Sequence, residues 1–202
     1  MHDHILRTSS TCFYHIRKLR QLRGVVSQMA MQRLVSAFVL SRLDYCNAVL
    51  ADLPSSSLAP LQRVLYAVVR LVGLGPRDHT TRTMMELHWL PIEHRIKFTL
   101  CLIMHAAVSG QCPDLIRGAV TTLAMLPGRN MLRAAANGLY DISRTRTIFR
   151  QRAFSVAGPR QWNDLPSDIR EITDRAAFKR ALKSLFLDSL MALIIDRHQI
   201  LF

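Results

Sequence analysis

The chain has 202 residues, of which 50% are hydrophobic and 20% charged, so it can bury a core and is not globally disordered. It carries 27 lysines and arginines against 14 acids, and this net charge of +13 favours a polyanionic partner. Only Lys18, Lys97, Lys179 and Lys183 are lysines, and arginine suits bidentate phosphate contacts and base stacking. Nucleic acid is therefore favoured over a membrane surface, and the alternative explanation is a codon bias that writes arginine for lysine.

The first half of the chain contains two predicted helical segments. Residues 12–22 form a basic segment that ends near Gly24. Residues 27–51 carry apolar residues at helical spacing in two stripes, which predicts a helix that is buried nearly all round. The first stripe consists of Met31, Leu34, Val35, Phe38, Tyr45 and Val49. The second stripe consists of Val39, Leu43, Cys46 and Leu50. The helix is expected to end before Pro54, which disfavours helical geometry in the preceding residue.

Two charged residues interrupt this apolar run in the stretch SRLDYCN (41–47). Arg42 and Asp44 lie two positions apart, so they point to different sides of one helix and each needs a partner elsewhere. We therefore expect Asp44 to pair with a distant cation rather than to act in catalysis. Arg42, Asp44 and Tyr45 are assigned to a structural motif of a buried helix, with Arg42 also able to reach a phosphate.

The next segments have clear boundaries. Residues 55–72 restart a helix, and GLGPRD (73–78) predicts a turn. A short helix from Thr80 or Thr81 to Leu87 is interrupted by LHWLP, and a long helix then runs to Gly110. His88 and Trp89 could form a recognition surface, but an amphipathic ring at a helix–helix corner is the favoured interpretation.

The remainder of the chain is less regular. Residues 111–148 contain the loop signals PGRN and ANG, and RTRTIF (144–149) is the one stretch with some β-alternation. Trp162 is expected to be a buried anchor before a helix break. The final amphipathic helix places Ala177, Phe178, Leu182, Leu185 and Phe186 on one face. The sequence thus predicts a mainly α protein: a helical bundle (1–110), a loop-rich connection (111–148), a smaller, partly irregular C-terminal helical subdomain (149–187) and an unassigned apolar tail (188–202).

Motifs for catalysis and metal binding are missing from the sequence. It has no nucleophile elbow, P-loop, Rossmann glycines or HExxH, and no two acids are adjacent. We therefore expect no catalytic residue, no metal site and no cofactor. The four cysteines lack CxxC spacing, which indicates free thiols in a reducing, intracellular compartment. No secretory signal or membrane span is expected, although the apolar tail is a candidate for self-association.

Two basic stretches contain no acid at all, namely His4–Leu43 and Ile142–Asn163. Basic stretches with interleaved aromatic residues suit phosphate neutralisation combined with base stacking, whereas a solvated helix face usually carries compensating acids. We predict non-specific binding of RNA, DNA or their hybrid, through backbone and shape. The predicted binding residues are Arg17, Lys18, Arg20, Arg23, Arg144, Arg146, Arg150 and Arg152.

Four blocks in this order resemble one known family. They are LVSAFVLSRLDYCNAVLADLP (34–54), LQRVLYAVVRLV (61–72), ELHWLPIEHRIKF (86–98) and RTRTIFRQRAFSVAGPRQWNDLPSDIR (144–170), followed by FKRALKSLF (178–186). Together they resemble the C-terminal part of the reverse transcriptase of LINE-type (non-LTR) retrotransposons, downstream of the polymerase palm.

The resemblance implies a helical, thumb-like region that grips the template–primer duplex, and a nuclear location. It also implies that the parent polymerase's paired aspartates, which hold Mg²⁺, lie upstream of Met1. This chain alone is then expected not to be an enzyme. The alternatives are a helical protein–protein interaction module and a non-functional relic of a mobile element.

Overall fold

The computed structural model describes residues 1–73, 80–126 and 138–199. They form two compact units, which we call unit 1 (Met1–Asn47 and Leu53–Arg95) and unit 2 (Ala48–Asp52 and Ile96–Phe202). The described residues are mainly helical and contain no strand, only an isolated antiparallel bridge between Thr122 and Tyr140. The predicted mainly α class is therefore confirmed.

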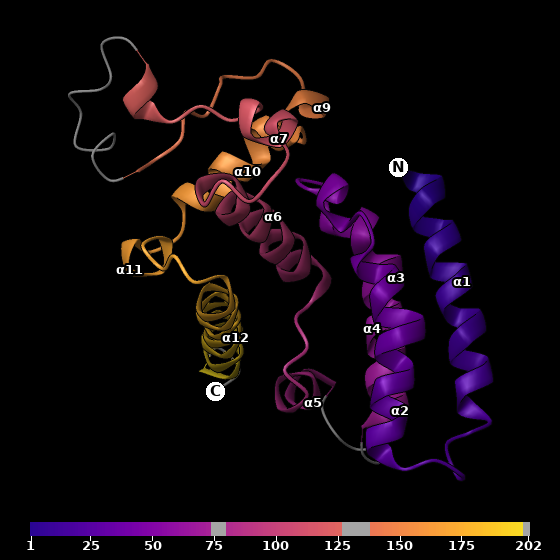
Figure 1. Cartoon of the computed structure of the whole chain (residues 1–202). Coiled ribbons are helices and arrows are strands. Elements are labelled where there is room, and N and C mark those ends of the chain that lie inside the picture. Colours follow the sequence, from indigo (N-terminus) through magenta and orange to yellow (C-terminus); the bar gives the residue numbers. More distant parts are fainter. Residues whose placement is uncertain (74–79, 127–137, 200–202) are drawn as a thin grey trace. The chain divides into compact units, whose positions relative to one another are not determined.

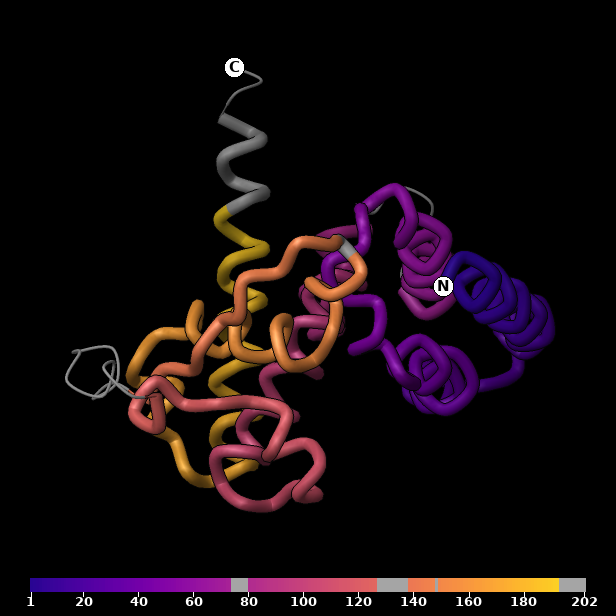
Figure 2. Tube along the Cα trace, turned by 90° about the horizontal axis from the view of Figure 1, so that it is seen from above, coloured from indigo at the N-terminus to yellow at the C-terminus, as the bar shows by residue number. Residues whose placement is uncertain are grey.

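Unit 1 is built on α1 (His2–Arg20), α2 (Gln28–Val35), α3 (Ser41–Asp44) and α4 (Ser55–Val72). In Figure 1, α1 runs antiparallel to α2 and α3, and Figure 2 shows the helices of this unit roughly end-on. One face of α1 is buried, at spacings of three and four residues that match the helical repeat: Ile5, Ser9, Cys12, Ile16 and Leu19. The helix thus begins well before the predicted basic segment at residue 12, because the buried spacing already starts at Ile5.

A π-helical turn, Ser36–Leu40, joins α2 to α3. Met31, Val35, Val39 and Leu43 are all buried although each lies four residues from the next. In a regular α-helix, each step of four residues rotates the side chain by roughly 40° beyond a full turn. The wider turn corrects this drift, and it therefore keeps one stripe on the core.

The prediction of one helix over residues 27–51, buried nearly all round, is wrong. Ser27 does cap the start, accepting a hydrogen bond from the amide of Ala30. The helix ends at Asp44, however, since Tyr45 is extended and Cys46 has a positive φ of 54°. A 3₁₀ turn, Asn47–Leu50, follows. The reason is tertiary: the side chain of Asn47 is buried, and its amide donates to the carbonyl of Arg95 at 3.5 Å.

The side chains of this region also depart from the prediction. Phe38, Tyr45 and Val49 are exposed rather than buried. Arg42 and Asp44 are exposed as well, so neither belongs to a buried helix. The core of unit 1 comes instead from one stripe of α1, one of α2–α3, and α4, which buries the largest set: Leu58, Leu61, Val64, Leu65, Val68, Val69, Leu71 and Val72.

The next two helices match the prediction closely. They are α5 (Thr80–Glu86) and α6 (Ile92–Val108). Beyond α6, Gly110 has a positive φ of 68°, and the amide of Gln111 donates to the carbonyl of Ala106 at 2.8 Å, which closes a Schellman motif. Of the turn predicted at residues 73–78, all but Gly73 lies outside the described residues.

Unit 2 packs α6, α10 (Phe154–Asn163), α11 (Ser167–Arg170) and α12 (Arg175–Gln199) around one apolar cluster. The rings of Trp162 and Phe178 lie 5.8 Å apart, and His105 stacks on Phe178 at 4.2 Å. Trp162 is 2% exposed, so its prediction as a buried anchor is confirmed. The buried members of the cluster are Cys101, Met104, Tyr140, Trp162, Leu165, Ile169, Phe178 and Leu182.

The shorter elements of unit 2 are α7 (Asp114–Gly118), a 3₁₀ turn (Leu123–Met125) and α9 (Ile148–Gln151). The predicted loops at PGRN and ANG lie outside the described residues, except for Gly138. The weak β-alternation of RTRTIF does not produce a strand. Its last two residues enter α9 instead, where the hydroxyl of Thr147 caps the helix by accepting from the amide of Arg150.

The two units divide the chain within α6, after Arg95, whereas the sequence suggested a boundary at residue 110. The start of α6 carries Glu93, His94, Arg95 and Lys97, whereas the later part supplies Cys101 and Met104 to the cluster of unit 2. The final helix packs Phe178 and Leu182 into the cluster, with Ala181, Leu185 and Phe186 against it. No helix in the described part of the chain is long and apolar enough to cross a membrane.

Candidate nucleic-acid interface

The C-terminal half of α1 presents the first predicted set of cations. Arg17, Lys18 and Arg20 lie in its last turn and are exposed, because the buried positions of this segment are Ile16 and Leu19. None of the three forms a salt bridge within the described residues. Within unit 1, their charges therefore remain available to bind the phosphate backbone of a nucleic acid.

Arg23 follows in the turn after α1. Its side chain is exposed, and its Nη2 donates to the carbonyl of Gly73 at 3.4 Å. This long hydrogen bond to a neutral oxygen leaves the positive charge uncompensated. We call Arg17, Lys18, Arg20 and Arg23 the α1 basic surface.

Three aromatic rings meet where α1 packs against the π turn, and one of them, Tyr14, lies next to Lys18. The rings of Tyr14 and His15 meet edge to face at 5.4 Å, and His15 stacks on Phe38 of the π turn at 5.7 Å. Lys18 Nζ lies 5.9 Å from the centre of the Tyr14 ring. We call Tyr14, His15 and Phe38 the ring strip. The ring strip connects α1 to the π turn. The same two elements also meet where the Cys12 thiol of α1 lies 4.0 Å from the carbonyl oxygen of Val39.

Sequence reasoning missed the ring strip, because it placed Phe38 in a buried stripe. A prediction based on the regular helical repeat cannot detect the π turn. That turn changes which side chains of residues 36–40 face the core. For Tyr14, the signal was present: it shares the face opposite the buried stripe of α1 with Arg7, Thr11 and Lys18.

The second predicted set of cations lies in unit 2. Arg144, Arg146 and Arg150 are exposed, and no salt bridge is found for them among the described residues. Arg152 is half-buried, and its Nε is buried without a hydrogen-bond partner within the described structure. Phe149, 81% exposed, stands among them. The two sets thus belong to different units, and each is a candidate surface by itself.

The structure shows the surroundings of Arg42, Asp44 and Tyr45, which were assigned from the sequence to a structural motif. Asp44 pairs with Arg95, with 2.6 Å between Arg95 Nη1 and Asp44 Oδ1, which confirms the expected pairing with a distant cation. Arg42 lies near enough to Cys12 for its charge to act on that thiol. Tyr45, 73% exposed, packs little.

His88 and Trp89 close the corner between α5 and α6. The amide of Trp89 donates to the carbonyl of Met84, and that of His88 donates to Met85, both at 2.8 Å. This is a Schellman motif in which His88, with a positive φ of 54°, takes the position usually held by glycine. Both residues therefore lie at the helix–helix corner, and the role expected for their rings stays a prediction.

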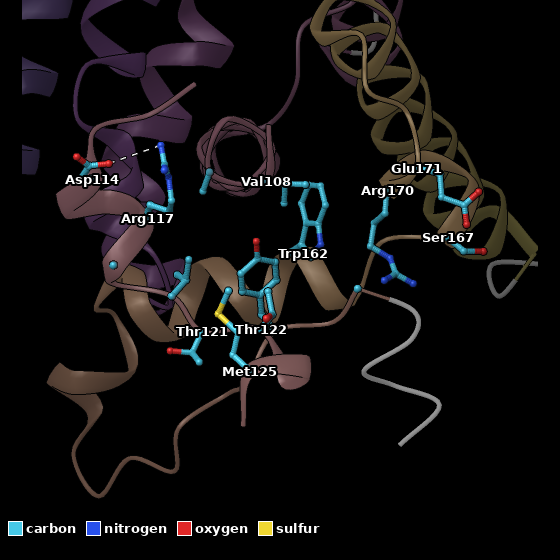
Figure 3. Close-up of a pocket in the computed structure, with 15 residues that line it drawn as sticks. Val108, Asp114, Arg117, Thr121, Thr122, Met125, Trp162, Ser167, Arg170 and Glu171 are labelled. Atoms are coloured by element: carbon cyan, nitrogen blue, oxygen red, sulfur yellow. Dashed lines mark ion pairs between the residues drawn. The ribbon is translucent and has the colours of Figure 1, made fainter. Parts of the chain in front are cut away.

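A large groove opens in unit 2, with a volume of about 1140 Å³ (Figure 3). Arg117 lies on one side and pairs with Asp114 at 3.6 Å, while Arg170 and Glu171 lie on the other. Trp162 and Thr122 lie between them. Because the two arginines are matched by two acids, the groove has no net charge to attract a phosphate. None of the predicted binding residues lines it.

Two cysteine thiols are buried and un-ionised at neutral pH. Burial raises the pKa of Cys12 to about 11, against a smaller opposing effect of Arg42. Burial raises the pKa of Cys101 to about 12, and the carboxylate of Asp164 adds to this. Burial also raises the pKa of Tyr140, with a smaller contribution from Cys112. These groups are therefore core residues rather than nucleophiles.

The described side chains include no cluster of three or more histidines, cysteines or acids that could hold a metal ion. Comparison of the chain with protein-family models, with curated proteins and with solved structures finds no match.

Proposed function

We propose that this protein binds nucleic acid non-specifically, through the phosphate backbone, with the α1 basic surface as a principal contact. The observation that carries the proposal is the absence of compensating acids. From His4 to Leu43 the chain has none, and Arg17, Lys18 and Arg20 are exposed without a salt bridge among the described residues. An ordinary solvated helix face would mix charges of both signs.

The segment 144–152 supports the same proposal for unit 2. It holds Arg144, Arg146 and Arg150, all exposed, next to the exposed ring of Phe149. Cations with an aromatic side chain among them suit a backbone contact combined with stacking. RNA, DNA and their hybrid are the proposed partners, since no base-reading motif was found in the sequence.

We further propose that the chain derives from the region after the palm of a LINE-type reverse transcriptase. The support is the order of the four sequence blocks, together with the mainly helical structure and the net charge of +13 of the chain. The paired aspartates of such a polymerase have no counterpart here, because no two acids are adjacent. The proposal therefore assigns no polymerase activity to this chain, and it places Mg²⁺ only in the parent enzyme.

The test is a fluorescence anisotropy titration of a labelled duplex at several salt concentrations between about 50 and 200 mM. We expect affinity to fall steeply with salt, by about 0.7–0.9 in the log–log slope for each phosphate neutralised. The variant Arg17→Gln/Lys18→Gln/Arg20→Gln should weaken binding and reduce that slope. A wild-type affinity that does not change with salt concentration would contradict the proposal.

A matched control is available on α12, where Arg175, Lys179 and Arg180 are exposed. Their triple glutamine variant removes the same charge from the chain without touching the proposed surface. If both triple variants lose affinity equally, only the net charge matters, and the α1 basic surface has no special role. The corresponding variant of Arg144, Arg146 and Arg150 measures the contribution of unit 2.

The alternative of an interaction module rests on the apolar tail. Just before the tail, Leu185 and Phe186 already pack against the core cluster of unit 2, and Leu190 of the tail is buried, which leaves less apolar surface for a partner. Light scattering measures the molar mass of the chain with and without residues 191–202. A mass that is the same for both would argue against self-association through these residues. A relic of a mobile element is indicated instead if circular dichroism finds no cooperative thermal transition.

A further inference from the structure

The ring strip offers aromatic surface to solvent. Tyr14, on α1, is 51% exposed, and Phe38, in the π turn, is 44% exposed, although both elements also carry buried residues. His15 is half-buried between them and contacts both rings. Exposed aromatic side chains that both rest against one half-buried ring are pre-positioned for a ligand with a flat apolar face.

The charges around the ring strip are all positive within the acid-free stretch. Lys18 lies against the Tyr14 ring, and Arg7 and Arg17 lie on the exposed side of the same helix. Arg42, exposed and four residues after Phe38, extends the charge to the neighbouring helix. The acid nearest in sequence to Phe38 and Arg42 is Asp44, which pairs with Arg95. The ligand is therefore expected to be anionic as well as aromatic.

A nucleic-acid base joined to its phosphate has both properties. In a duplex, the faces of the bases stack on one another, so a protein surface reaches only phosphates and base edges. In a single strand, the base faces are free, and each can stack on an exposed ring while the adjacent phosphate meets a cation. The ring strip thus adds a contact that only unpaired nucleotides can use.

Building on the proposed function, we infer that the ring strip binds unpaired bases, so that the protein prefers single-stranded nucleic acid to a duplex of the same sequence. Tyr14 and Phe38 supply the stacking surfaces. Lys18 and Arg42 neutralise the flanking phosphates. His15 holds the two rings in place from between them.

The experiment compares a labelled single strand and a labelled duplex of about 20 nucleotides, long enough to cover one site of this kind. Binding of each is measured by anisotropy for the full chain and for Tyr14→Leu and Phe38→Leu. Leucine keeps apolar volume on the helix but removes the aromatic face. We expect each substitution to weaken single-strand binding by about tenfold, and to leave duplex binding within about twofold. Circular dichroism spectra verify that both variants remain folded.

Phe149→Leu is the matched control, because this ring is also exposed within an acid-free basic stretch but lies in unit 2. It should leave the single-strand preference unchanged. If Phe149→Leu abolishes the preference while the two ring-strip variants retain it, the inference is overturned in favour of that segment.

The remaining outcomes separate the inference from the proposed function. Equal wild-type affinity for single strand and duplex, unaffected by the ring variants, overturns the inference and leaves backbone binding intact. An equal loss for both nucleic acids in the ring variants also overturns it. If the wild-type chain binds neither nucleic acid at low salt, the proposed function fails, and the ring strip becomes a candidate contact for an acidic protein.

Discussion

Arg95 holds the carboxylate of Asp44 from 51 positions away in the sequence, with its Nη1 at 2.6 Å from Oδ1 and 2.7 Å from Oδ2. The side chain of Arg95 is only 13% exposed, whereas that of Asp44 is 46% exposed. The same guanidinium donates through Nε to the carbonyl of Leu90 at 3.1 Å. The pair therefore fastens the end of α3 to the first turn of α6 inside unit 1.

Replacing Asp44 with asparagine should lower the free energy of unfolding of unit 1 by about 1 kcal/mol, because the mostly buried Arg95 loses its anionic partner. The chain has two tryptophans, Trp89 in unit 1 and Trp162 in unit 2. Urea unfolding followed by Trp89 fluorescence in a Trp162→Phe background measures the change. Asp188→Asn, an exposed acid on α12, is the control and should shift stability by less than about 0.5 kcal/mol. Equal effects of the two substitutions would contradict a structural role for the pair.

Gly158→Ala should destabilise unit 2 by about 1–3 kcal/mol, because there is no room for a methyl group at this position. A Cβ there would lie 2.8 Å from Cε2 of Phe154 and 3.0 Å from Sδ of Met104. Trp162 fluorescence in a Trp89→Phe background reports the unfolding of this unit. At Gly118, by contrast, a Cβ meets no atom within 4 Å, so Gly118→Ala should be neutral or stabilising. A tolerated Gly158→Ala would mean that α6 and α10 approach less closely than described.

His88→Gly should stabilise unit 1 by about 1 kcal/mol, since φ at this position is 54° and glycine adopts this backbone geometry without the steric penalty of a Cβ. His88→Ala removes the same imidazole but keeps the Cβ, so it should bring no gain. Thermal unfolding of both variants distinguishes relief of backbone strain from loss of the side chain. A gain in both would assign the effect to the imidazole instead.

The stability of unit 1 should fall at alkaline pH through Cys12. Its ordinary pKa of 9.0 is raised to about 11 in the folded chain. Below pH 9 both states hold the proton, and the contribution of the buried thiol is complete. Between pH 9 and 11 the unfolded chain has lost the proton and the folded chain retains it. The free energy of unfolding therefore declines, with a limiting slope of about 1.4 kcal/mol per pH unit for one thiol.

Urea midpoints at a series of pH values, with and without Cys12→Ala, test this prediction. The substitution should flatten the alkaline decline of unit 1. Cys46→Ala, which removes an exposed thiol, should leave the decline as it is in the wild-type chain. Identical pH profiles for Cys12→Ala and the wild type would show that the thiol ionises as easily in the folded state as in the unfolded one.

Strong local signals allowed much of the helical content to be predicted. The extents of α4, α5 and α6 follow from apolar spacing and from Pro54, Pro91 and Gly110. Trp162 and the apolar face of α12 were also identified, since a helical face with Phe178 and Leu182 has to be buried somewhere. These features depend on interactions between residues close in sequence, which a single sequence displays directly.

The route of the chain between residues 27 and 51 depended on distant contacts. Residues 36–40 form a π turn that holds one stripe on the core, and the helix ends where Asn47 contacts the carbonyl of Arg95. No local pattern contains that information, so Phe38 and Tyr45 were wrongly assigned to the buried side.

For the candidate interface too, one part was predictable from the sequence and another part was not. The order of residues by itself determined that Arg17, Lys18 and Arg20 lie in a basic stretch without acids, because local charge is read directly from the sequence. Only the tertiary structure decided that Tyr14, His15 and Phe38 meet beside it, since His15 and Phe38 are 23 residues apart and touch only when α1 packs against the π turn. The sequence thus determined the charge and most of the helices, whereas packing determined which rings face the solvent together.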